Sequence, residues 1–307
     1  MKNFVVAWSG IANVWECDEL GHLNMRHYLG KAVQARQMFL IQLGLRDAFK
    51  PGVSSTVRLR DVHIKYIREA RPGTQLHIET GLSRLDESSL QLTHIMYHHG
   101  GKVAATLIEN LDHTCRRTDE TFPWPNRVRE TATKKLALPP DIARPKGLSG
   151  HDIMTGPNLE QLRVWGCDQV GMGIFLTEET NVFQMIAAQA YIGRLSDTNA
   201  VFYKGWPDFD AQTWHEAEST GVMLELKLSV HRSAEPSDPY HIYSGVRGVA
   251  SKVRKLIHNF VNPLTGRSYA TVSVVNGLIH LKERRLVAPK PEHAKILEQS
   301  VIDGLHG

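Results

Sequence analysis

The clearest periodic pattern in the chain is helical and runs from Met25 to about Leu43. Apolar residues recur there at three- and four-residue spacing, which predicts one long helix with a single buried face. Asn24 stands before this helix as a candidate N-cap, and Gly44 follows its predicted end. Arg36 falls in the middle of the apolar face, where a charge is costly unless it is paired.

Alternating and β-branched runs follow this helix and predict four strands. They read TVRLRDVHIKYI, TQLHIETGL, LQLTHIMYH and KVAATLIENLDH, and turns containing Pro-Gly, Asp-Glu-Ser-Ser and Gly-Gly separate them. A further short strand is expected before the helix. One helix with these strands predicts an antiparallel sheet curled around a single helix, which is an α+β arrangement.

The chain also contains an internal repeat. The segment WECDELG at residues 15–21 shares Trp, Cys, Asp and Gly with WGCDQVG at residues 165–171, at a constant offset of 150. Further on, runs around His77 and His241 match at an offset of 164, which places an insertion near residues 205–219. A repeat of this length predicts two related domains in tandem.

We expect one domain over residues 1–122 and the other over residues 156–290. Each would have a short strand, one long helix and then four strands. The segment between them, residues 123–155, is rich in Pro and charge and lacks periodicity, which predicts an extended linker. Residues 291–307 would form a C-terminal tail.

Composition indicates a soluble globular protein. Of the 307 residues, 42% are hydrophobic and 22% charged, and no stretch approaches the ~18 apolar residues that span a bilayer, so we expect no membrane partner. The formal net charge of +4 suits an anionic small molecule and is too weak to indicate nucleic acid. The three cysteines make no disulfide framework, and the N-terminus lacks a signal-peptide cleavage site, so we expect a cytoplasmic protein.

Candidate chemistry concentrates at the start of the predicted helix, where the chain reads Asp18-x-x-Gly21-His22-x-Asn24-x-x-x-Tyr28. Amides at a helix N-terminus are donors at the positive end of the dipole and suit a developing oxyanion. Gly21 permits close approach of backbone to substrate, and Asp18 can attack a carbonyl or activate a water. Structural roles stay open: Asn24 as an N-cap, Asp18 as a turn residue, His22 as a loop residue and Tyr28 in packing.

This motif, followed by an Ala-Arg pair at residues 35 and 36, resembles the hotdog-fold thioesterases. The resemblance is to the branch that contains 4-hydroxybenzoyl-CoA thioesterase and the acyl-acyl carrier protein thioesterases. It implies a double hotdog, with two antiparallel sheets each wrapped around one long helix. It also implies hydrolysis of an acyl-CoA or an acyl-carrier protein to a free acid, without a metal or an organic cofactor.

The resemblance assigns roles to single residues. Asp18 would be the nucleophile or general base, and the amides of the helix N-terminus would form the oxyanion hole. His22 and Asn24 would orient the substrate or the water. Arg36 would be a structural anchor. The remaining substrate contacts of the motif would be Gly21, Met25 and Tyr28.

The second copy departs from the motif. Asp168 is retained, but at the offset of 150 His22 becomes Met172 and Asn24 becomes Ile174. We therefore expect one working site per chain, built on Asp18. Glu179 falls on the apolar face of the expected second helix, where it would either face the substrate pocket or pair with a basic neighbour.

Basic residues at strand ends could meet the phosphates of coenzyme A, and Arg71 and Arg116 are the candidates. A metal site is not expected. The histidines of the third and fourth strand runs lack Cys or carboxylate partners at ligand spacing, and alternate strand positions face opposite ways. These histidines are His94, His98, His99 and His113.

Two other functions are open. A hotdog hydratase or dehydratase would carry an Asp-x-Asn-Pro-x-x-His type of run, whereas Asp18 is followed by Glu-Leu-Gly-His without Pro. A non-catalytic module would bind acyl-CoA or an acyl-carrier protein without hydrolysing it. Whatever the function, exposed sheet edges could join copies of the chain into a homo-oligomer.

Overall fold

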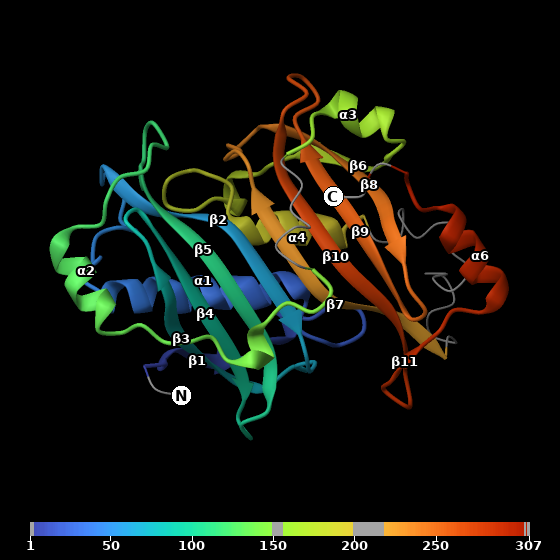
Figure 1. Cartoon of the computed structure of the whole chain (residues 1–307), viewed down its shortest axis with the longest axis horizontal. Helices are drawn as coiled ribbons and strands as arrows, with labels where there is room; N and C mark the ends of the chain where they lie inside the picture. Colours follow the sequence, from blue (N-terminus) through green and yellow to red (C-terminus); the bar gives the residue numbers. More distant parts are fainter. Residues whose placement is uncertain (1–2, 149–155, 199–217, 304, 306–307) are drawn as a thin grey trace. The chain divides into compact units, whose positions relative to one another are not determined.

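The computed structural model describes residues 3–148, 156–198, 218–303 and 305, and the chain divides into two compact units (Figure 1). The first unit spans Met1–Pro145 and the second spans Lys146–Gly307. In the described ranges no helix has both the length and the apolar character needed to cross a bilayer.

The first unit is an antiparallel sheet with one long helix. The sheet order is β1-β3-β4-β5-β2, and α1 packs against β1, β3, β4 and β5. The α+β prediction is therefore confirmed for this unit, and the four predicted strand runs are β2 to β5. The elements are β1 (Val5–Ile11), a 3-10 turn η1 (Val14–Glu16), α1 (Met25–Gln42), β2 (Ser55–Tyr66), β3 (Gln75–Leu85), β4 (Ser89–His98) and β5 (Val103–Cys115).

The long helix α1 forms where the periodic pattern predicts it. The Asn24 side chain accepts a hydrogen bond from the amide of Arg26, which caps the N-terminus. Its buried apolar face carries side chains at helical spacing, and Gly44 follows the last turn with a φ of +98° that favours glycine. The buried apolar residues of the helix are Tyr28, Leu29, Ala32, Ala35, Phe39 and Leu40.

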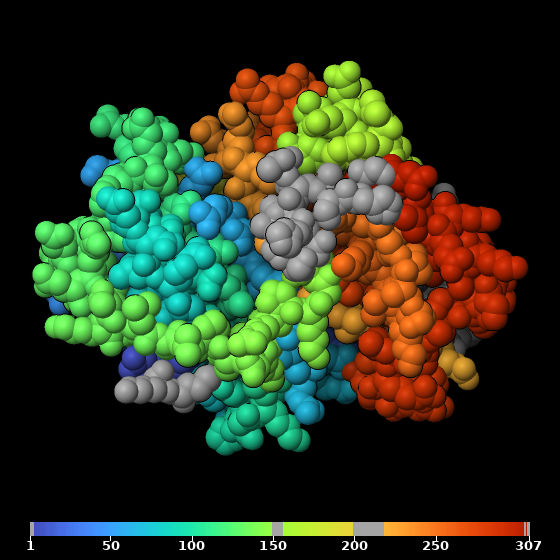
Figure 2. Space-filling view, in the orientation of Figure 1, coloured from blue at the N-terminus to red at the C-terminus, as the bar shows by residue number. Residues whose placement is uncertain are grey.

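The segment predicted as an extended linker contains a helix, α2 (Asn126–Thr133), on the surface of the first unit (Figure 2). Just before α2, the buried indole of Trp124 donates a hydrogen bond from Nε1 to the carbonyl of Ser89. At the 3-10 turn η2 (Asp141–Ala143), the Lys65 ammonium donates hydrogen bonds to the carbonyls of Ile142 and Arg144, each at 2.8 Å. Local sequence showed no period here because the contacts that order this segment come from the sheet.

The second unit contains antiparallel strands in the order β7-β10-β9-β8-β6, with β11 paired to β10. Its C-terminal segment, predicted as a tail, contains helix α6. The elements are α3 (Leu159–Val164), β6 (Asp168–Ile174), a 3-10 turn η4 (Thr177–Glu179), α4 (Ala188–Ser196), β7 (Ser219–Val230), β8 (Pro239–Val249), β9 (Val253–Val261), β10 (Ser268–His280), β11 (Leu286–Val287) and α6 (Pro291–Gln299).

The helix that follows β6 in the second unit, α4, has nine residues, against 18 in α1, so it is shorter than the long helix that was predicted. The amide and the hydroxyl of Thr198 both donate to the carbonyl of Leu195, which turns the chain out of the helix after Ser196.

Strand register identifies a repeat different from the predicted one. Val5 pairs with Thr80 in the first unit, and Asp168 pairs with Ser244 in the second. Both strands carry a bulge at the same place, between Val6 and Trp8 in β1 and between Gln169 and Gly171 in β6. From β1 to the start of α1, each residue of the first unit therefore corresponds to the residue numbered 163 higher in the second unit. Over β2 to β4 the difference in residue number is 164.

The predicted offset of 150 is therefore wrong for the motif region. Trp165 caps the C-terminus of α3, and Asp168 is the first residue of β6 rather than the start of a helix. The counterpart of Asp18 is Asn181. The nearly constant offset also removes the reason for an insertion near residues 205–219, most of which lies outside the described residues.

Candidate functional site

The predicted motif forms a closed turn between η1 and α1. Asp18 Oδ1 accepts hydrogen bonds from the amides of Leu20 (3.0 Å) and His22 (3.1 Å), and the Asp18 amide donates to the carbonyl of His22 (2.8 Å). Gly21 has a φ of +71°, in the left-handed region that favours glycine. The turn is set by contacts within a few residues, which is why its pattern is readable in the sequence.

The turn is attached to the segment that follows β2. The amide of Leu23 donates to the carbonyl of Ala70 at 2.7 Å. Beside it, His22 Nε2 lies 3.1 Å from Glu69 Oε2, an ion pair when the imidazole is protonated. Glu69 was not predicted, because it follows a strand without a motif of its own and is brought to His22 only by tertiary structure.

Burial controls the ionisation of Asp18. Desolvation raises its pKa above the ordinary value, and the hydrogen bonds from the amides of His22 and Leu20 lower it in part. Oδ2 of Asp18 has no hydrogen bond to any residue whose placement is described. One carboxylate oxygen therefore holds the turn, while the other is available to a substrate or a water.

Most amides of the predicted oxyanion hole are already in use. Between residues 20 and 27, every backbone N–H except that of Met25 donates to an acceptor within the described part of the chain. Met25 is the first residue of α1, so its N–H lies at the positive end of the helix dipole. Of the amides between residues 20 and 27, the Met25 N–H is therefore the candidate donor to an oxyanion.

Tyr28 and Asn24 have structural roles in the turn and helix. Tyr28 is buried edge-on against Tyr66, with ring centroids 5.2 Å apart. Desolvation raises the pKa of Tyr28 well above its ordinary value, so its hydroxyl stays protonated. Asn24 is the N-cap of α1, which is the structural role that the sequence left open for it.

The second unit repeats the turn without its charge. Asn181 Oδ1 accepts from the amides of Phe183 (2.9 Å) and Met185 (3.3 Å), and its own amide donates to the carbonyl of Met185 (2.9 Å). Ile186 donates to the carbonyl of Ala234, as Leu23 does to Ala70. The geometry of the turn therefore needs an oxygen acceptor at this position but no carboxylate.

Glu179 does not lie on a helix face, so its predicted placement is wrong. It ends η4, and its Oε2 accepts from the Leu176 amide (2.9 Å) and from Arg194 Nη2 (2.8 Å). Its counterpart Glu16 likewise binds the Lys31 ammonium at 2.7 Å. Of the two roles predicted for Glu179, the structure shows the pairing with a basic neighbour, Arg194.

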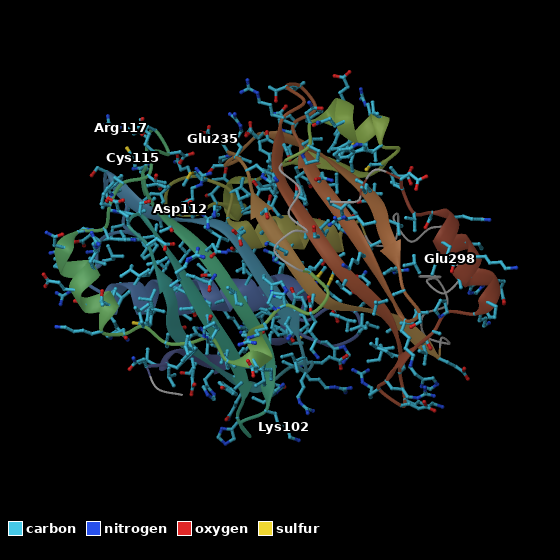
Figure 3. The ribbon with its side chains drawn as sticks, in the orientation of Figure 1. Lys102, Asp112, Cys115, Arg117, Glu235 and Glu298 are labelled. Atoms are coloured by element: carbon cyan, nitrogen blue, oxygen red, sulfur yellow. The ribbon has the colours of Figure 1, made fainter. Side chains whose placement is uncertain are left out.

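Arg71 and Arg116 lie at opposite ends of β2. Arg71 follows Ala70, on the side of the Asp18 turn, whereas the Arg116 amide bonds the carbonyl of Ser54, just before β2 begins. Figure 3 shows the same separation at β5, with Lys102 at one end and Arg117 at the other. The 12 residues of β2 extend over roughly 35–40 Å, so only Arg71 is near the turn.

A buried polar cluster explains Arg36 and His94. Arg36 Nη1 lies 3.3 Å from Glu109 Oε1, and His94 Nε2 lies 3.2 Å from Glu109 Oε2. The other nitrogen of His94 shares a hydrogen bond with Thr80 at 2.8 Å. The described ranges contain no group of three or more His, Cys, Asp or Glu side chains placed to hold a metal.

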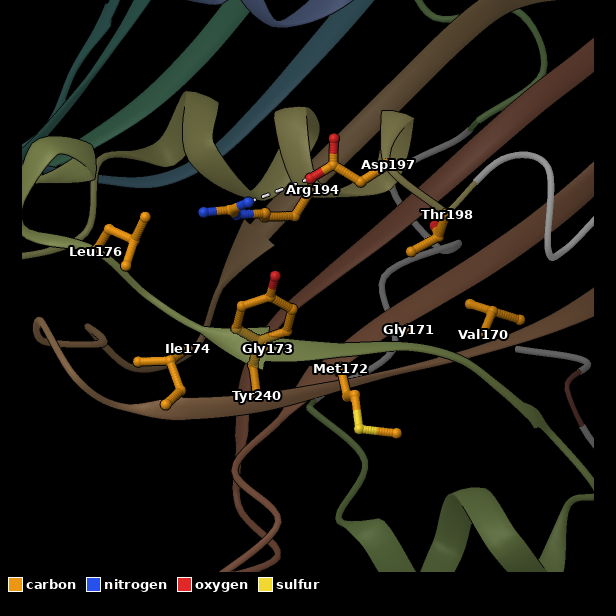
Figure 4. A pocket seen from close by; sticks show the side chains of 10 residues that line it. All are labelled: Val170, Gly171, Met172, Gly173, Ile174, Leu176, Arg194, Asp197, Thr198 and Tyr240. Carbon is orange, nitrogen blue, oxygen red and sulfur yellow. Dashed lines mark hydrogen bonds and ion pairs between the residues drawn. The ribbon is translucent and has the colours of Figure 1, made fainter.

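A cleft of about 370 Å³ opens in the second unit (Figure 4). It lies between β6, the C-terminal half of α4 and Tyr240 of β8. None of the predicted site residues lines it.

Comparison with known proteins finds similarity over the segment that contains the Asp18 turn. Residues 12–132 match the Thioesterase-like superfamily. A segment of 108 residues is 28% identical to L-carnitine dehydrogenase/betainyl-CoA thioesterase of Agrobacterium fabrum. This match covers 35% of the chain and 22% of the length of that relative.

Solved structures are similar over both units. An acyl-ACP thioesterase from Bacteroides thetaiotaomicron aligns with a TM-score of 0.65 and 9% identity, over 89% of this chain and 98% of its own. A 12:0-ACP thioesterase from Umbellularia californica aligns with a TM-score of 0.64 and 11% identity, over 88% and 93%. At these identities the likeness shows a shared fold. The family match covers the Asp18 turn and α1.

Proposed function

We propose that this protein hydrolyses an acyl thioester to a free acid and a thiol at the Asp18 turn. One observation carries the proposal: Asn181 makes the same turn in the second unit, so the negative charge of Asp18 is not needed for folding. Asp18 is a half-buried carboxylate that the fold does not require, and it lies in a thioesterase-like domain. A catalytic role explains it best.

In the proposed reaction, Asp18 acts as a general base or as a nucleophile. As a base it takes a proton from water, the resulting hydroxyl bonds to the thioester carbon, the C–S bond breaks, and the thiolate takes the proton from Asp18 and leaves as the free thiol. The Met25 N–H stabilises the oxyanion that forms on the carbonyl oxygen. His22, held beside Glu69, orients the water or the substrate.

The thiol carrier is coenzyme A or an acyl-carrier protein, both of which present phosphate. Arg71, next to the segment that binds the turn, is the candidate contact. The solved proteins of similar fold act on acyl-carrier proteins by their names, and the curated relative on betainyl-CoA. We further propose a double hotdog, with domains at residues 1–122 and 156–290.

Thiol release tests this function. The purified chain is incubated with a panel of acyl-CoA esters and acyl-carrier proteins, and free thiol is measured with a thiol reagent. We expect release from at least one member of the panel. Binding of acyl-CoA without release would favour the non-catalytic module, and hydration of an enoyl-CoA would favour the hydratase.

A single working site per chain predicts that Asp168→Ala leaves activity intact. Asp168 is exposed at the start of β6, and the true counterpart of Asp18 is an asparagine. We expect kcat/KM within about two-fold of the wild-type value, since surface changes away from a site act weakly. Loss of turnover in a folded Asp168→Ala protein would assign catalysis to the second unit.

A further inference from the structure

Two exposed apolar side chains stand directly before the Asp18 turn. The 3-10 turn η1 carries Val14 and Trp15, which are 68% and 78% exposed. Single exposed apolar residues are common on protein surfaces, whereas adjoining ones more often mark a contact with a ligand or a partner. The position of this pair next to the proposed catalytic carboxylate therefore needs an explanation.

Hydrogen bonds hold η1 against the N-terminus of α1. The amide of Asn24 donates to the carbonyl of Glu16 at 2.9 Å, and the Lys31 ammonium of α1 binds the Glu16 carboxylate. Trp15, which directly precedes Glu16, is thereby kept at the end of α1 that presents the Met25 N–H. This N–H is the candidate donor to an oxyanion.

The second unit builds the same turn without the apolar pair. In η4, Thr177 takes the position of Val14 and Glu178 takes the position of Trp15. In both units the amide of the helix N-cap residue donates to the last carbonyl of the 3-10 turn at 2.9 Å. The fold of the turn therefore needs no apolar residue at either position.

The exposed tryptophan occurs together with the carboxylate. Where Asn181 replaces Asp18, Gln184 also replaces Gly21 in a similar backbone conformation, with φ values of +59° and +71°. A Cβ on Gly21 would meet no described atom within 4 Å, so there is open space beside the turn of the first unit. Trp15, this space and the carboxylate are thus features of one unit and absent from the other.

The surface of η1 is apolar and carries no net charge. Glu16 is its charged residue, and its two carboxylate oxygens lie 2.8 and 2.7 Å from the Lys31 ammonium, so the two charges cancel. An indole ring beside a valine gains most by covering apolar surface. On the basis of the function proposed above, we propose that Trp15 and Val14 bind the acyl group of the thioester and select apolar acyl groups over short or charged ones.

Alkyl-CoA thioethers test this selection without turnover, because a thioether cannot be hydrolysed. Binding of S-hexyl-CoA and S-ethyl-CoA to the full chain is measured by calorimetry. We expect the hexyl compound to bind at least about ten-fold more tightly, since each buried methylene contributes roughly 0.8 kcal/mol when fully covered. Tighter binding of a thioether that ends in a trimethylammonium group would overturn the apolar selection.

The double variant Val14→Thr/Trp15→Glu gives η1 the residues of η4, which this fold accommodates. We expect its affinity for S-hexyl-CoA to fall about ten-fold and its affinity for S-ethyl-CoA to stay within about two-fold of the wild-type value. Thermal unfolding checks that the variant is folded, and Trp15→Ala makes the same comparison if it is not. Trp15→Phe, which keeps an aromatic ring, should retain most of the preference.

Leu138→Glu is the matched control, because Leu138 is 90% exposed and lies far from η1. The residue before it bonds the carbonyl of Leu82, seven positions along β3 from Gln75, where β1 and η1 meet the strand, and seven positions span roughly 23 Å. The affinity of this variant for both thioethers should match that of the wild type.

Three results would refute the assignment of the acyl group to Trp15. Equal losses of hexyl and ethyl affinity in Val14→Thr/Trp15→Glu would place Trp15 against the coenzyme. Unchanged affinities would place it outside the site. A changed oligomeric state in light scattering, with equal losses, would show that a second copy covers the patch. In contrast, an intact hexyl preference in a chain that releases no thiol would refute the proposed hydrolysis and support the apolar site.

Discussion

Asp18→Asn is expected to lower kcat/KM for thioester hydrolysis by about 10²–10⁴-fold, the usual contribution of a general base, while the protein folds normally. The amide oxygen of asparagine can accept the same two backbone hydrogen bonds as Asp18 Oδ1, as Asn181 does in the second unit. Steady-state kinetics with the thiol reagent, alongside thermal unfolding, separates the two effects.

The pH profile gives the same prediction a second readout. Burial raises the pKa of Asp18, and a base must be ionised to act, so the acid limb of kcat/KM should lie above the pH at which an exposed aspartate titrates. Because the charged form is disfavoured by desolvation, Asp18→Asn should leave the Tm unchanged or slightly higher.

Asp18→Ala is the matched control. It removes the acceptor as well as the charge, leaving the amides of Leu20 and His22 without Oδ1, and should destabilise the protein by about 1–2 kcal/mol. Full turnover by a folded Asp18→Asn protein would show that the carboxylate is only a turn residue.

Glu109→Val should lower the free energy of unfolding by about 3–5 kcal/mol, the typical loss when one partner of a buried ion pair is removed. Glu109 is fully buried and Arg36 is 8% exposed, so the variant strands a buried guanidinium. Burial alone would raise the pKa of Glu109, but Arg36 and His94 together lower it, which indicates that the carboxylate is charged.

The valine is chosen from the second unit, where Val274 occupies the position of Glu109 opposite Leu256. There the histidine that corresponds to His94 is His258, and burial together with Arg254 lowers its pKa to about 3, so it stays neutral. With valine at this position, a neutral histidine is thus compatible with the sheet.

Removing both charges isolates the ion pair. Arg36→Leu/Glu109→Val should recover most of the stability lost in Glu109→Val, because no buried charge remains unpaired. Urea unfolding of the wild type, both single variants and the double variant measures the coupling. A Glu109→Val protein as stable as the wild type would show that Arg36 reaches solvent and is not an anchor.

The sequence by itself determined the elements whose signals are local. The period of α1, its Asn24 cap and the four alternating strands of the first unit could be predicted, because each depends on neighbours within a few residues. The turn of Asp18 is readable for the same reason. The sequence showed that the chain contains a repeat, but it gave the wrong offset for the motif region. The Trp and Asp residues shared by residues 15–21 and 165–171 do not define a strand register.

Tertiary structure alone decided which residues meet. Only strand pairing at the bulges of β1 and β6 identifies Asn181, rather than Asp168, as the counterpart of Asp18. Glu69 beside His22 and Glu109 beside Arg36 are brought together from distant parts of the chain. Such contacts depend on the register and packing of whole elements, and no local period records them.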